Sequence, residues 1–99
     1  MQTNRNEKQT IGTIALVVSK DKENSGSKRI NITITNTSSS GQNITLAIDA
    51  EAKDKEGIYL SPGGYWSDSQ ESGYTSTQKM ITAISDAAGG IVSIQERLI

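Results

Sequence analysis

Hydrophobic and polar residues alternate along several short stretches of this chain, most clearly between Lys28 and Asn36. Ile30, Ile32 and Ile34 occupy every second position there, and the residues between them are polar. This period of two predicts a β-strand with one buried face and one solvated face. Isoleucine is β-branched and stiff at χ1, which favours a strand over a helix. Because the isoleucine face needs cover from other segments, a layered β-structure is expected.

Short apolar runs separated by turn-forming residues predict the remaining strands. Pro62 and Gly63 suit the two central positions of a type II turn, since proline presets φ and glycine accepts a positive φ. With about seven short strands, the chain is expected to be all-β. The architecture predicted is a small antiparallel β-sandwich, Ig-like or jelly-roll-like, with a small β-barrel as the alternative. The other predicted strands are 10–20, 42–50, 58–60, 79–85 and 90–96.

The order of these strands also suggests how they pair. The strand 42–50 has an apolar face of its own and is predicted to lie antiparallel beside 28–36. The strands 79–85 and 90–96 are predicted to form a hairpin around the loop 86–89. In the strand 10–20, apolar residues occupy both faces, so both faces are expected to be covered.

Residues 1–9 are polar and carry alternating charges, so they are predicted to form a flexible N-terminal arm. The alternative is an arm that becomes ordered against a neighbouring subunit. Residues 10–99 are then expected to form a single β-sandwich domain. No apolar stretch typical of a secretory signal occurs at the start, and the longest apolar run, Ile14–Val18, is too short to span a bilayer.

Composition excludes several functions. The net charge of −1 and the absence of a basic run argue against binding to nucleic acid. The chain has no cysteine and no histidine, which removes disulfides, thiolate metal sites and the commonest general base. Its serines lie in no Gly-x-Ser-x-Gly motif. The chain is therefore predicted not to be an enzyme and to need no cofactor.

The stretch from Asp49 to Glu56 holds four carboxylates and suggests a cation site at first sight. The spacing does not match the calcium loop of an EF-hand, however, and two lysines lie among the acids. A solvated loop is the favoured interpretation, and no metal site is expected.

Aromatic residues provide the one feature with binding character. Tyr65, Trp66 and Tyr74 have apolar faces with a polar edge, which suits both sugar stacking and protein interfaces. Trp66 has a second interpretation, which is favoured: it fills the core of a chain without phenylalanine. At the C-terminus, the apolar Leu98 and Ile99 are expected to pack on the domain or on another subunit.

Three segments follow one another in a characteristic order: the alternating strand 29–36, the sequence Gly-Ile-Tyr-Leu-Ser-Pro-Gly-Gly at 57–64, and the paired strands that run from Ile81 to Glu96. From Lys28 onward this order of features resembles the small β domain of tailed-phage structural proteins, especially capsid decoration (cement) and head-fibre proteins. The acidic stretch 49–56 and the long polar segment 67–77 depart from this pattern. They affect the expected binding surface more than the expected fold.

This resemblance implies a non-enzymatic virion protein that binds, decorates and stabilises the capsid surface. Its partner would be the shell of major capsid protein, and it would be a homotrimer made in the host cytoplasm. Contacts are then expected from the N-terminal arm, the segment 67–77, Leu98 and Ile99. The alternative is a carbohydrate- or receptor-binding module of a tail or fibre that uses Tyr65, Trp66 and Tyr74 on a host-surface glycan. Neither function involves nucleic acid or a membrane.

Overall fold

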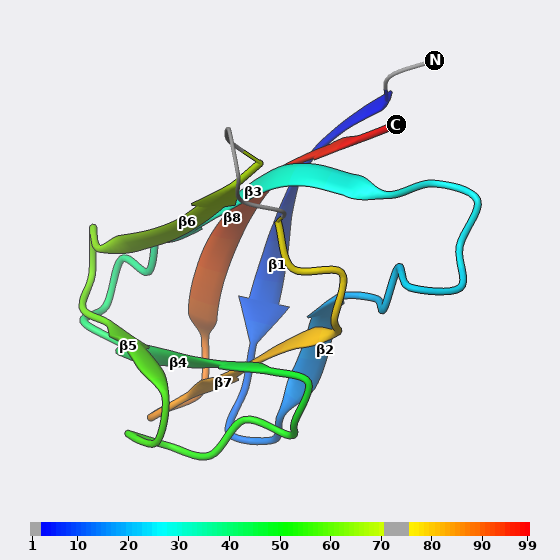
Figure 1. Cartoon of the computed structure of the whole chain (residues 1–99). Coiled ribbons are helices and arrows are strands. Elements are labelled where there is room, and N and C mark those ends of the chain that lie inside the picture. The colour runs from blue at the N-terminus through cyan, green and yellow to red at the C-terminus, as the bar shows by residue number, and fades with distance from the viewer. Residues whose placement is uncertain (1–2, 71–75) are drawn as a thin grey trace.

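The computed structural model describes residues 3–70 and 76–99, and this part of the chain contains eight strands and no helix (Figure 1). The strands are β1 (Thr3–Ile11), β2 (Leu16–Ser19), β3 (Arg29–Asn36), β4 (Ile44–Ile48), β5 (Ile58–Leu60), β6 (Tyr65–Ser69), β7 (Ile81–Ser85) and β8 (Gly90–Leu98).

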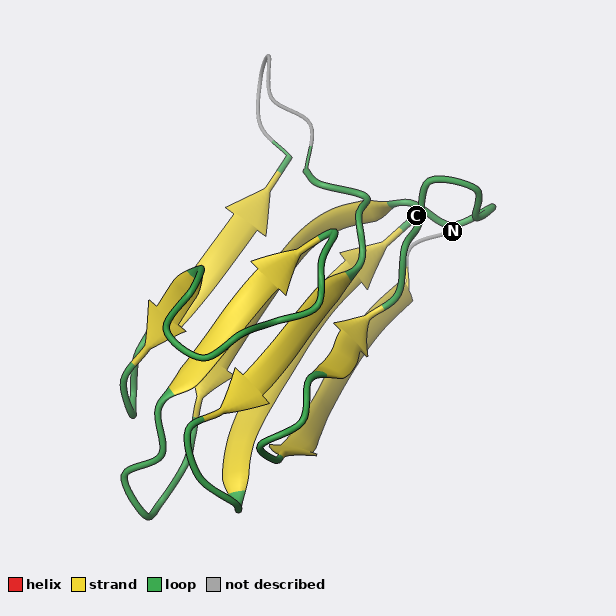
Figure 2. Ribbon diagram, turned by 90° about the horizontal axis from the view of Figure 1, so that it is seen from below, coloured by secondary structure: helices red, strands yellow, loops and turns green. Residues whose placement is uncertain are grey.

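The strands form two antiparallel sheets of four that pack face to face (Figures 1 and 2). Sheet A has the order β1-β8-β3-β6, and sheet B has the order β2-β7-β4-β5. Every connection crosses from one sheet to the other except the one between β4 and β5. This is the strand order of a jelly roll. The prediction of a small all-β sandwich is confirmed, and the two sheets do not close into a barrel.

The core lies between the sheets and consists of aliphatic side chains from both. Because side chains alternate along a strand, each sheet turns every second residue inward. The fully buried core residues are Ile11, Val18, Ile32, Ile34, Ile44, Leu46, Ile81, Ala83, Val92 and Ile94.

The isoleucine alternation of β3 predicts its faces correctly for most of the strand. Ile32 and Ile34 are completely buried, but Ile30 is only half-buried. The register with β8 shifts between Arg29 and Asn31, and such a bulge places an extra residue on one strand. As a result, Arg29 rather than Ile30 points into the interior at this end of β3.

Two predicted pairings are wrong. β3 and β4 belong to different sheets, as do β7 and β8, so neither pair forms a hairpin. In both cases the apolar faces of consecutive strands meet across the core instead of lying side by side. Hydrophobic periodicity identifies an apolar face but not the direction from which that face is covered.

The predicted domain boundary is also wrong, because Thr3–Gln9 is part of a strand and not an arm outside the domain. β1 pairs with β8 in continuous register from Thr3, opposite Leu98, to Ile11, opposite Gly90. Likewise, the expected strand 10–20 is interrupted: β1 ends at Ile11 in sheet A, and β2 begins at Leu16 in sheet B. A strand, β6, also occupies the start of the segment expected to be a polar loop.

The predicted turn at Pro62 and Gly63 is present. Gly63 has a φ of 86°, and the Gly64 N–H donates to Ser61 O over 2.7 Å. These two features define a type II turn, in which proline precedes a residue with positive φ. The turn carries the chain from β5 in sheet B to β6 in sheet A.

The acidic segment 49–57 lies across the outer face of sheet B (Figure 2). Ala52 is buried there, Thr82 Oγ1 donates to Ala50 O over 2.6 Å, and the Lys55 N–H donates to Thr45 Oγ1 over 3.0 Å. The segment therefore covers two hydroxyl-bearing residues of the sheet. Its carboxylates remain exposed, and no group of three potential metal ligands occurs among the described residues.

Candidate functional site

An ion pair between Arg29 and Glu96 lies inside the sandwich. Glu96 occupies a position at which the alternation of β8 predicts an apolar residue. Arg29 Nε is 2.8 Å from Glu96 Oε2, and both side chains are almost fully buried. Ser19 from the opposite sheet donates its hydroxyl to the same carboxylate oxygen over 2.6 Å. The three residues therefore join sheet A to sheet B through polar contacts.

The guanidinium of Arg29 uses all of its N–H donors. Nη1 donates to the carbonyls of Thr77 and Lys79, over 2.5 and 3.1 Å. Nη2 donates to Ser19 Oγ and to the carbonyl of Lys20, over 2.5 and 3.1 Å. A buried arginine is stable only when its charge is paired and its donors are satisfied. Arg29 therefore organises the chain segments that flank β2 and β7.

Glu96 is held in its charged form. Burial is the largest single influence and favours the neutral acid. Hydrogen bonds from Arg29 and Ser19, together with the positive charge of Arg5, oppose burial and outweigh it. The pKa of Glu96 is consequently lower than that of an ordinary glutamate.

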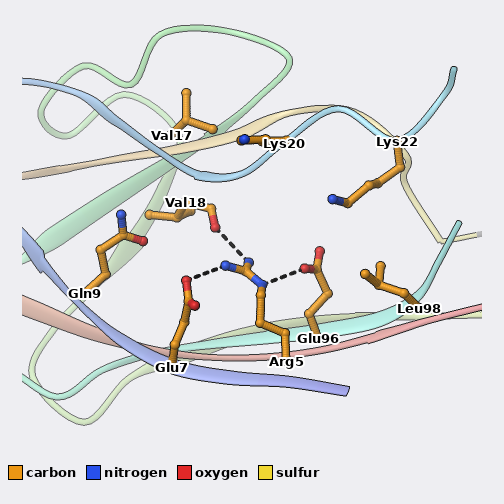
Figure 3. A pocket seen from close by; sticks show the side chains of 9 residues that line it. All are labelled: Arg5, Glu7, Gln9, Val17, Val18, Lys20, Lys22, Glu96 and Leu98. Carbon is orange, nitrogen blue, oxygen red and sulfur yellow. Dashed lines mark hydrogen bonds and ion pairs between the residues drawn. The ribbon is translucent and has the colours of Figure 1, made fainter. Parts of the chain in front are cut away.

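Arg5 continues this network to the surface, where it forms the floor of a groove between β1 and β2 (Figure 3). Its Nε is 2.9 Å from Glu96 Oε1, its Nη1 pairs with Glu7, and its Nη2 donates to Val18 O over 2.8 Å. We call this the edge groove. It has a volume of about 330 Å³ and is lined by Arg5, Glu7, Gln9, Val17, Val18, Lys20, Lys22, Glu96 and Leu98.

The edge groove contains one polar atom without a partner. Gln9 Oε1 is buried and accepts no hydrogen bond from the described residues. Buried polar groups are nearly always paired in folded proteins, because an unpaired one costs about 1–3 kcal/mol.

Next to the groove, β2 is an edge strand with exposed apolar side chains. Among the described strands, β2 pairs with β7 on one side only; no strand pairs with its other side, where Val18 O accepts from Arg5. Leu16 and Val17 on this strand are both exposed, and Ile14 just before it is 82% exposed. No charged residue occurs between Ile11 and Ser19. Soluble proteins usually protect free edges with charges or proline, and β2 has neither.

The residues that the sequence predicts to bind a partner do not lie together in the structure. Tyr65 is 68% exposed and lies on the outer face of sheet A, opposite Thr35. Trp66 is its neighbour on β6 but points inward, is half-buried and packs against the core. The two side chains therefore do not form one aromatic platform.

The remaining selected residues lie elsewhere. Leu98 lines the edge groove, while Ile99 is exposed and exchanges two backbone hydrogen bonds with Lys28. The prediction for Tyr74 falls outside the described residues.

Sequence reasoning missed the ion network, although the sequence contains a signal for it. Val92 and Ile94 are followed by Glu96 in the same inward series of β8. An acid that continues an apolar alternation implies a buried charge, which in turn requires a basic partner. Arg29 could not be assigned in the same way, because the bulge that turns it inward has no signature in the pattern.

No set of three metal-ligating side chains comes together among residues 3–70 and 76–99. No helix long and apolar enough to cross a membrane occurs in these same ranges.

Comparisons with known proteins support the fold alone. No protein-family model matches the sequence, and no curated protein is similar to it in sequence. Among solved structures, the chain is similar to a protein from Bacillus endospore appendages, which are described as a family of disulfide-linked pili. The identity is 13% and the TM-score is 0.57, over 99% of this chain and 84% of the other. At this identity the similarity establishes a shared architecture and no shared function.

Proposed function

We propose that this chain is a non-enzymatic structural subunit that binds a larger protein assembly through the β2 edge. The observation that carries the proposal is the exposure of Leu16 and Val17 on the uncharged edge strand β2, and of Ile14 just before it. Covering apolar side chains that are exposed to water at a strand edge lowers the free energy, so their exposure favours the binding of a partner.

The backbone of β2 adds specificity to such a contact. A free edge presents unpaired N–H and C=O groups, and an extended segment of a partner can pair with them. Main-chain pairing and apolar contact would then reinforce each other, because Leu16 and Val17 lie on the two sides of the same strand edge.

The capsid shell of a tailed phage is the assembly that the sequence resemblance favours, with the chain bound on its outside as a homotrimer. A protein that binds only the assembled shell stabilises that shell by mass action. The structural neighbour from Bacillus endospore appendages, which are pili, supports the proposal to the extent that a protein of similar architecture occurs in a large assembly. That neighbour comes from a disulfide-linked family, whereas this chain has no cysteine and would make its contacts without disulfides.

The test begins with virus particles purified by density gradient from a lysate of the organism that encodes the chain. Mass spectrometry of these particles is expected to detect the tryptic peptide 30–53 in a fixed ratio to the major shell protein. Particles that contain their other structural proteins but lack this peptide would refute the proposal.

A second step tests the surface. Recombinant chain is added to particles that lack it, and the bound amount is measured after sedimentation. The double substitution Leu16→Lys with Val17→Lys is expected to abolish binding, because two charges would be buried at the contact. Ser67→Lys on the opposite sheet is the matched control and is expected to bind like the unmodified chain. Equal binding of both variants would reject the β2 edge.

A further inference from the structure

The outer face of sheet A carries a regular array of hydroxyl and amide side chains, which we call the polar face. In register across β1, β8, β3 and β6, one row contains Asn6, Gln95, Thr33 and Ser67. The row beside it contains Lys8, Ser93, Thr35 and Tyr65. Neighbouring side chains within a row are separated by the strand spacing of about 4.8 Å.

The polar face is hollowed over its two central strands. The hollow has a volume of about 340 Å³ and is lined by Asn6, Glu7, Thr33, Thr35, Ser93, Ile94 and Gln95. Five of these belong to the polar face and are uncharged and polar, whereas Glu7 and Ile94 alternate with them and direct their side chains to the other side of the sheet. The side chains of the polar face therefore favour a ligand that is neutral and that exchanges hydrogen bonds with the sheet.

These side chains match the chemistry of sugar hydroxyls. Serine, threonine, asparagine and glutamine each donate and accept hydrogen bonds, as a sugar hydroxyl does. Thr33 and Thr35 are β-branched and have restricted χ1 angles, and Thr33 Oγ1 lies 3.2 Å from Ser67 Oγ. Groups held in place before binding lose little conformational entropy when a ligand arrives.

Tyr65 stands at the edge of this array and supplies an aromatic surface. Its side chain is 68% exposed, and it lies opposite Thr35 in the register of β3 and β6. An aromatic ring with a free face can pack against the apolar C–H face of a sugar ring, while its hydroxyl remains available for hydrogen bonding. We propose that the polar face binds a neutral glycan chain, with Tyr65 stacking on one sugar and Thr33, Thr35 and Gln95 bonding to the hydroxyls of the next.

This site is independent of the β2 edge, which belongs to the other sheet. A structural subunit that has both surfaces would bind its assembly through sheet B and present sheet A to a glycan. The site also differs from an aromatic cluster of Tyr65 with Trp66, because Trp66 points into the core.

The test uses the whole chain labelled with ¹⁵N and titrated with linear oligosaccharides of glucose, mannose, galactose and N-acetylglucosamine. At least one of these is expected to shift the amide signals of Thr33, Thr35 and Gln95 in a saturable manner. Tyr65→Ala is expected to weaken the binding about tenfold, as the loss of an aromatic contact and one hydrogen bond predicts. Thr33→Val keeps the shape of the side chain without its hydroxyl and is expected to weaken binding about fivefold.

Tyr59→Ala is the matched control. Tyr59 is also an exposed tyrosine, at 44%, but it lies on β5 at the edge of sheet B. Its removal is expected to leave glycan binding unchanged. The proposal is overturned if none of the four oligosaccharides shifts the signals, if the shifts fall on sheet B, or if Tyr59→Ala and Tyr65→Ala weaken binding equally. The variant Leu16→Lys is expected to keep glycan binding, which separates this result from that of the assembly test.

Discussion

Arg29 and Glu96 form an ion pair of 2.8 Å in the interior of a sandwich whose other interior residues are mostly aliphatic. The pair replaces apolar packing at one end of the core with a network that includes Ser19 from the opposite sheet. Such a network fixes how the two sheets meet at that end, since each charge requires a specific partner. It also supports Arg5, which forms the floor of the edge groove.

The first prediction concerns the charge of Glu96. Glu96→Gln removes the carboxylate that neutralises Arg29, and breaking one side of a buried pair costs about 3–5 kcal/mol. The free energy of unfolding, measured by urea titration, should fall by this amount. Glu23→Gln is the control, because the pair of Glu23 with Lys79 is exposed to solvent and should contribute little to stability. Similar losses in the two variants would contradict the assignment of the buried network.

The second prediction concerns pH. Because the pKa of Glu96 is lower in the folded chain than its ordinary value of 4.5, the folded state binds its proton less readily than the unfolded state. The stability that ionised Glu96 contributes to the folded state is therefore fully present above about pH 4.5. It is lost as the pH falls toward the lower pKa that Glu96 has in the folded chain. Urea titrations at pH 6, 5, 4 and 3 should show this decline in the unmodified chain.

Asp86 adds to the decline, since hydrogen bonds from Asn43 lower its pKa as well. The variant Asp86→Asn removes that contribution and isolates the effect of Glu96. Stability that stays constant from pH 6 to pH 3 in Asp86→Asn would show that Glu96 is not held in its charged form.

The third prediction concerns Gly57, at the end of the segment that covers sheet B. Its φ is 138°, and a Cβ at this position would lie 2.5 Å from Leu46 O. Gly57→Ala should therefore cost at least about 1–3 kcal/mol in the free energy of unfolding. Gly26→Ala is the matched control, because a Cβ there meets nothing within 4 Å, and it should change stability by less than about 1 kcal/mol. A tolerated Gly57→Ala would mean that this segment does not lie against β4.

The fourth prediction concerns β1. Removing residues 1–9 takes away nearly all of the register with β8 and the contact of Arg5 with Glu96. The shortened chain should lose cooperative unfolding, because β8 then becomes a free edge and the core opens. Arg5→Met, which keeps the strand, should unfold cooperatively at a lower urea concentration. Circular dichroism distinguishes the two, and an unchanged midpoint after the deletion would show that β1 is dispensable.

The sequence predicts the class of fold because the inward series are regular. Ile32 and Ile34 on β3, like Val92 and Ile94 on β8, follow the period of two and are buried as expected. Pro62 and the glycine after it likewise define their turn from local chemistry. Local patterns of this kind depend on neighbours in the chain, which the sequence contains directly.

Pairing and the polar elements could not be predicted in the same way. β1 has polar and charged residues on both faces up to Ile11, because its inward side chains Arg5, Glu7 and Gln9 line a groove instead of a core. A strand without an apolar face gives no periodic signal. The two candidate surfaces depend on segments that are far apart in the sequence. The polar face forms only when four strands lie in register, and β2 can be recognised as an edge strand only when the sheet order is known.

The central claim is that the β2 edge binds a protein assembly, and site-specific photo-crosslinking on particles tests it most directly. A photoreactive amino acid is placed at Leu16 in one preparation and at Ser67 in another, and both are bound to purified particles and irradiated. The account predicts that the probe at position 16 crosslinks to a shell protein or to a second copy of the chain, and that the probe at position 67 crosslinks to neither. Crosslinks from position 67 without any from position 16 would contradict it and would place the contact on sheet A.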